Sequence, residues 1–305
     1  MKSKIIASVR LLGSGHEFQK KQHKTMINKL VLLLLLMPLF SIAQDDLLKD
    51  IDTVATKQKV ESAFKGLKIV NIESTKLAAK GDLYFIVAHR FGSIEDGIEG
   101  FFGLDNAVTQ IKFTYGLNNW LTVSAGRSEQ AYDFSGKYLL YSQYENGFPF
   151  AIAGFSSIAF NNTLKESNYP KMEFEDRIIY VNQLLVSRKF TNRLSLQLAP
   201  TYLHENFVID DNQDNSQFLI GMGGRFKFAK RWSLNVDYAT HLNRSSTSPF
   251  HDPLSIGVDL ETGGHVFQMH ISNSQGIHEA GFLGNTPGLW ENGDIFFGFN
   301  LLRVF

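Results

Sequence analysis

The chain contains no cysteine and, after residue 43, no long run of apolar residues. Without cysteine it has no disulfide framework, no cysteine-based metal or catalytic site, and no attachment point for the lipid of a lipoprotein. Because a helix needs about 20 apolar residues to cross a bilayer, residues 44–305 are not expected to contain a transmembrane helix. No charge of one sign dominates, since 30 basic residues balance 30 acidic ones. The composition therefore gives no electrostatic reason to bind nucleic acid.

An apolar run near the beginning of the chain has the features of a secretory signal peptide. Lys29 provides the positive charge before the run, and Ser41 and Ala43 frame a small-x-small cleavage site after it. We therefore expect residues 26–43 to be a signal peptide that directs export. The preceding residues 1–25 are basic and have no apolar core, so we interpret them as a mis-annotated extension; a long, genuine n-region is the alternative.

Removal of the first 43 residues would change the charge balance. They hold seven Lys or Arg residues and one acidic residue, Glu17, so the exported chain would keep 23 basic and 29 acidic residues and a net charge of −6. The remaining 262 residues fit one all-β domain. With 26 Phe and 13% aromatic residues, the chain is rich in side chains that a lipid-facing surface would accommodate and a soluble surface would not.

Segments of roughly 8–13 residues in which apolar and polar residues alternate recur twelve times along the chain. In one of the clearest, Leu194 and Leu196 point one way, and Ser195 and Gln197 point the other way. This period of two predicts strands with one apolar and one polar face. The predicted strands are residues 83–91, 107–116, 120–127, 134–143, 150–160, 177–190, 194–203, 217–228, 232–241, 254–260, 265–272 and 294–305. Because the region 120–143 is weakly bounded, ten or fourteen strands remain alternatives.

The connections between these predicted strands alternate in length. The short ones are residues 117–119, 145–149, 191–193, 229–231 and 261–264, and the long ones are residues 92–106, 128–133, 161–176, 205–216, 242–253 and 273–293. Outer-membrane β-barrels have this asymmetry, with tight periplasmic turns and longer outer loops. A soluble β-sandwich, which is the alternative, would have edges to protect and no reason for six long loops at one end.

The last predicted strand ends the chain on Phe305, and an aromatic final residue is typical of outer-membrane β-barrels. We therefore predict an all-β protein, in which residues 83–305 form a closed antiparallel transmembrane β-barrel of about 12 strands. Its location would be the outer membrane. The polar residues 44–82 would form either a periplasmic N-terminal segment or a plug inside the barrel, and the sequence does not choose between them.

Seven short stretches follow one another in a characteristic order over residues 60–305. They are FKGLKIVN (64–71), HRFG (89–92), FGLD (102–105), YGL (115–117), GRS (126–128), KYLL (137–140) and GFNLLRVF (298–305). Together they resemble an uncharacterised family of Bacteroidetes-type outer-membrane β-barrels, which is a domain of unknown function. The resemblance implies an outer-membrane barrel with no assigned activity, and it carries over no catalytic residues.

The polar faces of the predicted strands would line the lumen of the barrel. The best-supported lumen residues are Gln110, Lys112, Gln197, Arg225, Lys227, Asn235, Asp237 and Asp259. Because the turn at 229–231 brings two strands together, we expect Arg225 and Asp237 to be close enough to pair. Eight strands leave room only for side chains, and sixteen or more leave a channel. For twelve strands, a mixed-charge solute pathway and a network that fills a closed barrel both remain open.

Three histidines near the predicted outer ends of strands, His204, His241 and His270, are weak candidates for metal ligands, because imidazole is the commonest ligand. Their strands are not neighbours, and alternate strands lie about 10 Å apart. We therefore expect no metal and no cofactor. The sequence also has no Gly-x-Ser-x-Gly motif and no fixed spacing of Ser and His, so we expect no enzyme activity.

The function that these patterns favour is a narrow solute channel or transport-related barrel with a mixed-charge lumen. A structural or partner-binding barrel with an occluded lumen is the alternative, and a lipid-active outer-membrane enzyme is the third reading. The expected partners are outer-membrane lipid and, for a partner-binding barrel, a periplasmic or surface protein, without nucleic acid.

Overall fold

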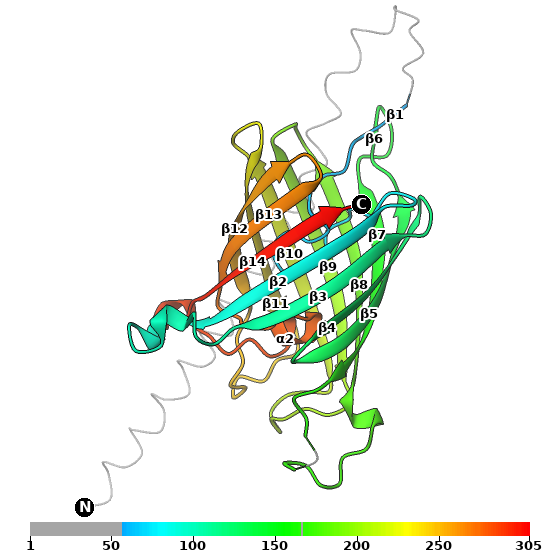
Figure 1. Cartoon of the computed structure of the whole chain (residues 1–305). Helices are drawn as coiled ribbons and strands as arrows, with labels where there is room; N and C mark the ends of the chain where they lie inside the picture. The colour runs from blue at the N-terminus through cyan, green and yellow to red at the C-terminus, as the bar shows by residue number, and fades with distance from the viewer. Residues whose placement is uncertain (1–56, 166) are drawn as a thin grey trace, which may run out of the picture. The chain divides into compact units, whose positions relative to one another are not determined.

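The computed structural model describes residues 57–165 and 167–305 (Figure 1). The expected extension at residues 1–25, the expected signal peptide at residues 26–43 and the segment 44–56 lie outside these described residues. No helix among the described residues is long and apolar enough to cross a bilayer.

A closed barrel of twelve antiparallel strands forms the described part of the chain (Figure 1). Its strands are β2 (Leu83–Ser93), β3 (Val108–Gly116), β4 (Leu121–Ser128), β5 (Ala131–Tyr141), β7 (Ala151–Asn161), β8 (Ile178–Lys189), β9 (Leu194–Glu205), β10 (Ser216–Lys227), β11 (Trp232–His241), β12 (Leu254–Thr262), β13 (His265–Ser272) and β14 (Phe296–Val304). The last strand pairs with the first, since β14 lies antiparallel to β2. The prediction of an all-β, closed, twelve-stranded antiparallel barrel is therefore confirmed.

The period-two pattern explains why these segments form a barrel with two different faces. Along β9, Leu194, Leu196 and Leu198 are exposed, while Ser195 and Gln197 are buried. Side chains of a strand alternate between its two faces, so the exposed apolar set lies outside and the buried polar set lies inside. An outward apolar band is what a lipid environment requires, because lipid cannot satisfy polar groups.

Short connections gather at one end of the barrel, which we call the turn end. They are residues 117–120, 190–193, 228–231 and 263–264, together with 142–150, which contains the two-residue strand β6 (Tyr144–Glu145). At the other end, the loop end, the connections are residues 94–107, 162–177, 206–215, 242–253 and 273–295. Both termini of the barrel, Leu83 and Phe305, lie at the turn end, where each backbone N–H donates to the other's carbonyl.

One loop-end connection is not long. Residues 128–133 were expected to form a long loop, but β4 runs to Ser128 and β5 begins at Ala131, which leaves a turn of two residues. The prediction was wrong because the hydroxyl of Ser128 accepts the N–H of Ala131 at 3.1 Å and closes a tight hairpin. Alternation of Ala131, Tyr132 and Asp133 then extends the strand.

Residues 61–79, which we call the finger, lie inside the barrel. The finger follows β1 (Gln58–Lys59), which pairs with β6 at the turn end, and it leads back to β2 at the same end. Its tip is a tight turn in which Ile69 N–H donates to the Ile72 carbonyl at 2.8 Å. Phe64, Ile69 and Ile72 are each only 1% exposed. The finger thus enters and leaves by one end of the barrel.

The connection between β13 and β14 also folds inward, from the loop end. It carries the short helix α2 (Glu279–Leu283), whose Phe282 and Leu283 are buried (Figure 1). These two side chains belong to one buried apolar cluster with Ile72 of the finger and Leu185 of the wall. The lumen is therefore filled from both ends, and the two filling segments meet in its middle.

Candidate functional site: the interface between the finger and the lumen wall

One aspartate of the wall binds the tip of the finger through three successive backbone amides. The Oδ2 atom of Asp237 on β11 accepts hydrogen bonds from the N–H groups of Val70 at 3.0 Å, Asn71 at 2.7 Å and Ile72 at 2.8 Å. Successive backbone N–H groups that point at one spot form an anion-binding concavity. Here the anion is a carboxylate of the wall, buried at 3% exposure.

Other wall residues also hold the finger through its main chain. Gln197 on β9 accepts the N–H of Thr75 at 3.0 Å and donates to the carbonyl of Glu73 at 2.7 Å. Thr122 on β4 accepts the N–H of Ala78 at 3.0 Å. The side-chain amide of Gln197 thus binds the finger backbone at Glu73 through its nitrogen and at Thr75 through its oxygen.

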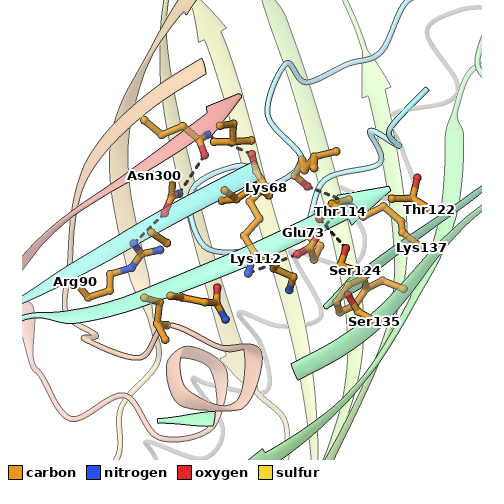
Figure 2. A pocket seen from close by; sticks show the side chains of 18 residues that line it. Lys68, Glu73, Arg90, Lys112, Thr114, Thr122, Ser124, Ser135, Lys137 and Asn300 are labelled. Atoms are coloured by element: carbon orange, nitrogen blue, oxygen red, sulfur yellow. Dashed lines mark hydrogen bonds and ion pairs between the residues drawn. The ribbon is translucent and has the colours of Figure 1, made fainter. Parts of the chain in front are cut away.

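A buried cluster of charges joins the finger, the wall and the inward loop, and Figure 2 shows its members Lys68, Glu73, Lys112 and Lys137. Lys137 on β5 contacts the carboxylate of Glu73 at 2.7 Å, and Lys112 on β3 contacts Asp133 at 2.7 Å. Lys68 of the finger contacts Glu279 of α2 at 2.8 Å. Buried charges are costly unless they are paired. These pairs therefore favour the arrangement in which finger and loop are both inside.

Two further kinds of contact attach the finger to the wall. Arg90 on β2 donates to the side-chain oxygens of Asn71 at 2.8 Å and of Asn300 on β14 at 2.9 Å. The hydroxyls of Thr75 in the finger and Ser187 on β8 are 2.6 Å apart. Contacts to β2, β4, β5, β8, β9 and β11 thus surround the finger on all sides of the barrel.

The space that remains beside the finger is small. The cavity has a volume of about 40 Å³ and is lined by Lys68 and Glu73 of the finger and by wall residues that include Arg90, Lys112 and Lys137 (Figure 2). A water molecule needs roughly 10–15 Å³ of such volume. The cavity therefore holds a few water molecules and is too small for an organic solute.

Seven of the eight residues predicted to line the lumen are buried. They are Gln110, Lys112, Gln197, Arg225, Asn235, Asp237 and Asp259, whereas Lys227 is half-buried at the turn end of β10. Gln110 and Lys112 line the cavity, and Gln197 and Asp237 bind the finger. The remaining residues lie on β10, β11 and β12 and have no hydrogen bond to the finger among the described contacts.

The expected pair of Arg225 and Asp237 does not form. Arg225 lies opposite Asn235 in the register of β10 and β11, and Asp237 lies opposite Gly223. Arg225 instead pairs with Glu261 on β12 at 2.5 Å and donates to the hydroxyl of Ser233 at 3.1 Å. The turn places the two strands side by side, but a separation of two register positions directs each side chain to another partner.

The three candidate histidines are not brought together. His204 contacts the hydroxyl of Ser216 at 2.9 Å, and His241 contacts Asp252 at 3.1 Å. His270 is buried on β13, and its ring nitrogens have no partner among the described residues. No group of three or more His, Asp or Glu side chains within residues 57–165 and 167–305 has the arrangement of a metal site.

Several residues of this interface were not predicted. Lys137 and Thr122 alternate with outward residues along β5 and β4, so a clearer boundary of these strands would have identified them. Glu73 and Glu279 lie in segments without a strand period. Their pairing with Lys137 and Lys68 joins residues that are far apart in sequence, and no local pattern signals such a contact.

The class of the protein follows from these features. An even-numbered, closed antiparallel barrel with an apolar outer face, short turns at one end and a polar interior is a transmembrane β-barrel of the outer-membrane type. The chain belongs to the family described as membrane bound beta barrel domain (DUF5777), whose model matches residues 64–305. The predicted resemblance to a barrel family of unknown function is confirmed, and the protein is located in the outer membrane.

Solved structures of three membrane barrels are similar to this chain. The NanC porin has a TM-score of 0.46 at 10% identity, with 73% of this chain and 98% of that chain covered. The KdgM porin in complex with disordered oligogalacturonate has a TM-score of 0.45 at 8% identity, with 73% and 99% covered. The translocator domain of the autotransporter NalP from Neisseria meningitidis has a TM-score of 0.33 at 12% identity, with 75% and 89% covered. No protein of curated function matches the sequence at a significant level.

Proposed function

We propose that the protein is a gated solute pathway of the outer membrane, closed in this conformation by its own finger. The observation that carries the proposal is that the lumen is filled by a segment that enters and leaves by the turn end. A twelve-stranded barrel is wider than the eight-stranded barrels that side chains alone fill, and the finger, together with the inward loop that carries α2, fills this wider lumen. Catalysis is no part of the proposal.

The contacts of the finger are of a kind that water can replace. They are mainly hydrogen bonds and ion pairs to the wall, such as those of Asp237, Gln197 and Lys137. A hydrogen bond contributes only about 0.5–1.5 kcal/mol net, because water satisfies the same groups when the bond opens. The strand ladder of the barrel does not depend on the finger. Withdrawal of the finger would therefore expose the polar wall residues that it contacts, and water can hydrate these residues.

The second candidate is a structural or partner-binding barrel whose lumen stays occluded. One observation favours it: Ile72 of the finger shares a buried apolar cluster with Phe282 and Leu283 of the inward loop. Burying such side chains contributes about 1.5–3 kcal/mol each, and this contribution opposes withdrawal. In that case a periplasmic or surface protein would bind the loops. In both cases outer-membrane lipid is the partner of the apolar outer face, and the charge gives no reason for a nucleic acid partner.

A disulfide between finger and wall tests the gate directly. The chain has no native cysteine, and the hydroxyls of Thr75 and Ser187 are 2.6 Å apart. We expect the unmodified protein and the reduced double variant Thr75→Cys/Ser187→Cys to show discrete openings in planar bilayers, and the double variant to become silent when oxidised. Reduction should restore the openings, because the disulfide only prevents the finger from leaving.

A matched control places a disulfide within the wall. The hydroxyls of Thr114 on β3 and Ser124 on β4 are 2.8 Å apart, and among the described contacts neither side chain has a hydrogen bond to the finger. The variant Thr114→Cys/Ser124→Cys should conduct equally when oxidised and when reduced. Equal conductance of the finger variant in both redox states would show that the finger is not the gate. Silence of every form, including the unmodified protein, would favour the occluded structural barrel.

A further inference from the structure

We infer that the lumen wall is a binding surface for the backbone of peptides, and that the solutes of this pathway are short peptides. The inference rests on the proposed function and names its class of solute. The observation behind it is that the wall recognises the finger mainly through the finger's main chain. Of the contacts described above, those of Asp237, Gln197 and Thr122 all go to backbone groups of the finger.

Cationic and amide groups of the wall also bind backbone carbonyls. The ammonium of Lys137 donates to the carbonyl of Leu67 at 2.8 Å and to that of Lys76 at 3.1 Å. Gln268 on β13 donates to the carbonyl of Ile69 at 3.3 Å. The wall thus offers donors to carbonyls of the finger and acceptors to its N–H groups, and every non-proline residue of a peptide carries one group of each kind.

This pattern does not depend on the side chains of the bound segment. Gln197 forms hydrogen bonds with the N–H of Thr75 and the carbonyl of Glu73, and any non-proline residues at these positions offer the same groups. Recognition by main-chain hydrogen bonds is how proteins bind extended peptides of variable sequence. An oligosaccharide has hydroxyl groups in place of this fixed series of amides, so it would leave part of the wall unsatisfied.

The charges of the wall fit the two ends of a short peptide. Lys137 on β5 binds a carboxylate, that of Glu73, while Asp237 on β11 binds a cluster of N–H donors. β5 and β11 lie on nearly opposite sides of the ring of strands. With the finger withdrawn, the ammonium of Lys137 would donate to the terminal carboxylate of a peptide. Asp237 would accept hydrogen bonds from the terminal ammonium of the peptide or from its first amides.

The finger then acts as a competitor that is tethered to the wall it binds. Tethering gives it a high effective concentration, so a free peptide displaces it only when the peptide is abundant. Occupation of the wall by peptide would hold the finger outside. Solute binding and opening would be coupled in this way without any change in the strands.

The experiment measures exposure of the finger in the full-length protein. In the variant Thr75→Cys the new thiol is buried against the wall, so a thiol reagent modifies it only when the finger leaves. The modification rate is measured with hexa-alanine, with the same peptide methylated at every backbone nitrogen, and with a linear oligosaccharide of similar length. We expect hexa-alanine to raise the rate several-fold and the other two probes to leave it unchanged. Methylation removes the N–H groups that Asp237 and Gln197 require.

A pair of glutamine variants locates the effect on the wall. Gln197→Leu in the Thr75→Cys background should raise the basal rate and reduce the response to hexa-alanine, because it removes two backbone contacts. Gln183→Leu is the matched control. Gln183 is equally buried on the neighbouring strand β8, but it donates to Thr201 of the wall and not to the finger. It should leave both the basal rate and the response unchanged.

The outcomes separate this inference from the proposed function. If the disulfide controls conductance but none of the three probes changes the modification rate, the gate stands and the peptide inference is overturned. An equal response to all three probes overturns it as well. If hexa-alanine alone raises the rate while the disulfide leaves conductance unaffected, the wall binds peptides but the finger is not a gate.

Discussion

At the scale of single residues, two buried aspartates on neighbouring strands have different roles. Asp237 accepts three N–H groups of the finger, whereas Asp259 accepts the side-chain amide of Gln268 at 3.0 Å within the wall. Both are nearly inaccessible, with exposures of 3% and 2%. The sequence predicted that both face the lumen but not that only one of them binds the finger, because that difference depends on where an irregular segment lies.

The two aspartates give a matched pair of variants. We expect Asp237→Asn to loosen the finger, since hydrogen bonds to a charged group contribute about 1.5–3 kcal/mol and a neutral amide accepts more weakly. A loss of 1.4 kcal/mol corresponds to about a tenfold change in an equilibrium. The modification rate of Thr75→Cys should therefore rise about tenfold or more in this variant. Asp259→Asn should raise that rate less, because Asp259 reaches the finger only through Gln268, and an equal rise in both variants would contradict the assigned role of Asp237.

At the scale of elements, the inward loop is held at the loop end by a cluster around Asp252. Arg244 donates to the carbonyl of Gly284 at 2.8 Å, next to α2, and its guanidinium lies 3.4 Å from Asp252. His251, beside Asp252, donates its backbone N–H to the carbonyl of Thr286 at 2.9 Å. The connection 242–253 therefore holds the loop that carries α2 in the lumen.

Acid should release this loop. Burial alone would raise the pKa of Asp252, but hydrogen bonds from neighbours that include His241 and Tyr238 outweigh burial and lower the pKa to about 2. A carboxyl group whose pKa is below its unfolded value of 3.8 stabilises the structure above that value and loses this effect as the pH falls towards 2. We expect pepsin to cleave at Phe282 and Leu283 increasingly between about pH 4 and pH 2.

The variant Asp252→Asn checks that this carboxylate is responsible. Its loop should already be sensitive to pepsin at about pH 4, with little further change on acidification. Identical pH profiles of the variant and the unmodified protein would show that another group controls the loop.

At the scale of the whole molecule, the barrel could be predicted from the sequence, but the positions of the finger and the inward loop inside it could not. The period of two along segments such as β9 and β11 indicates which face meets lipid, because the outward residues of these strands are predominantly apolar. The interior is less regular, because β8 turns the apolar residues Ile179, Val181 and Leu185 inward against α2. The finger has no regular secondary structure, and its partners are spread along the sequence from Arg90 to Asp237 and beyond. Only the assembled structure brings them together.

The backbone bonds by which Phe305 closes the ring of strands contribute measurably to the stability of the barrel. Phe305 donates its N–H to the carbonyl of Leu83 at 2.9 Å and accepts the N–H of Leu83 at 3.2 Å, while its ring is exposed. Deletion of Phe305 should lower the free energy of unfolding by about 1–3 kcal/mol, because two backbone bonds are lost. The midpoint of heat-induced gel-mobility change in SDS measures this. Phe305→Ala keeps both bonds and should shift the midpoint less; an equal shift would assign the effect to the ring.

The hairpin path of the finger also determines how fast the lumen can change. Since the segment returns to the end from which it came, the described residues 57–82 enter and leave the ring at one end. Such a movement is a loop motion, which takes nanoseconds to microseconds, and it needs no refolding step. A single assembled barrel can therefore fill and empty its lumen many times without ever losing its fold in the membrane.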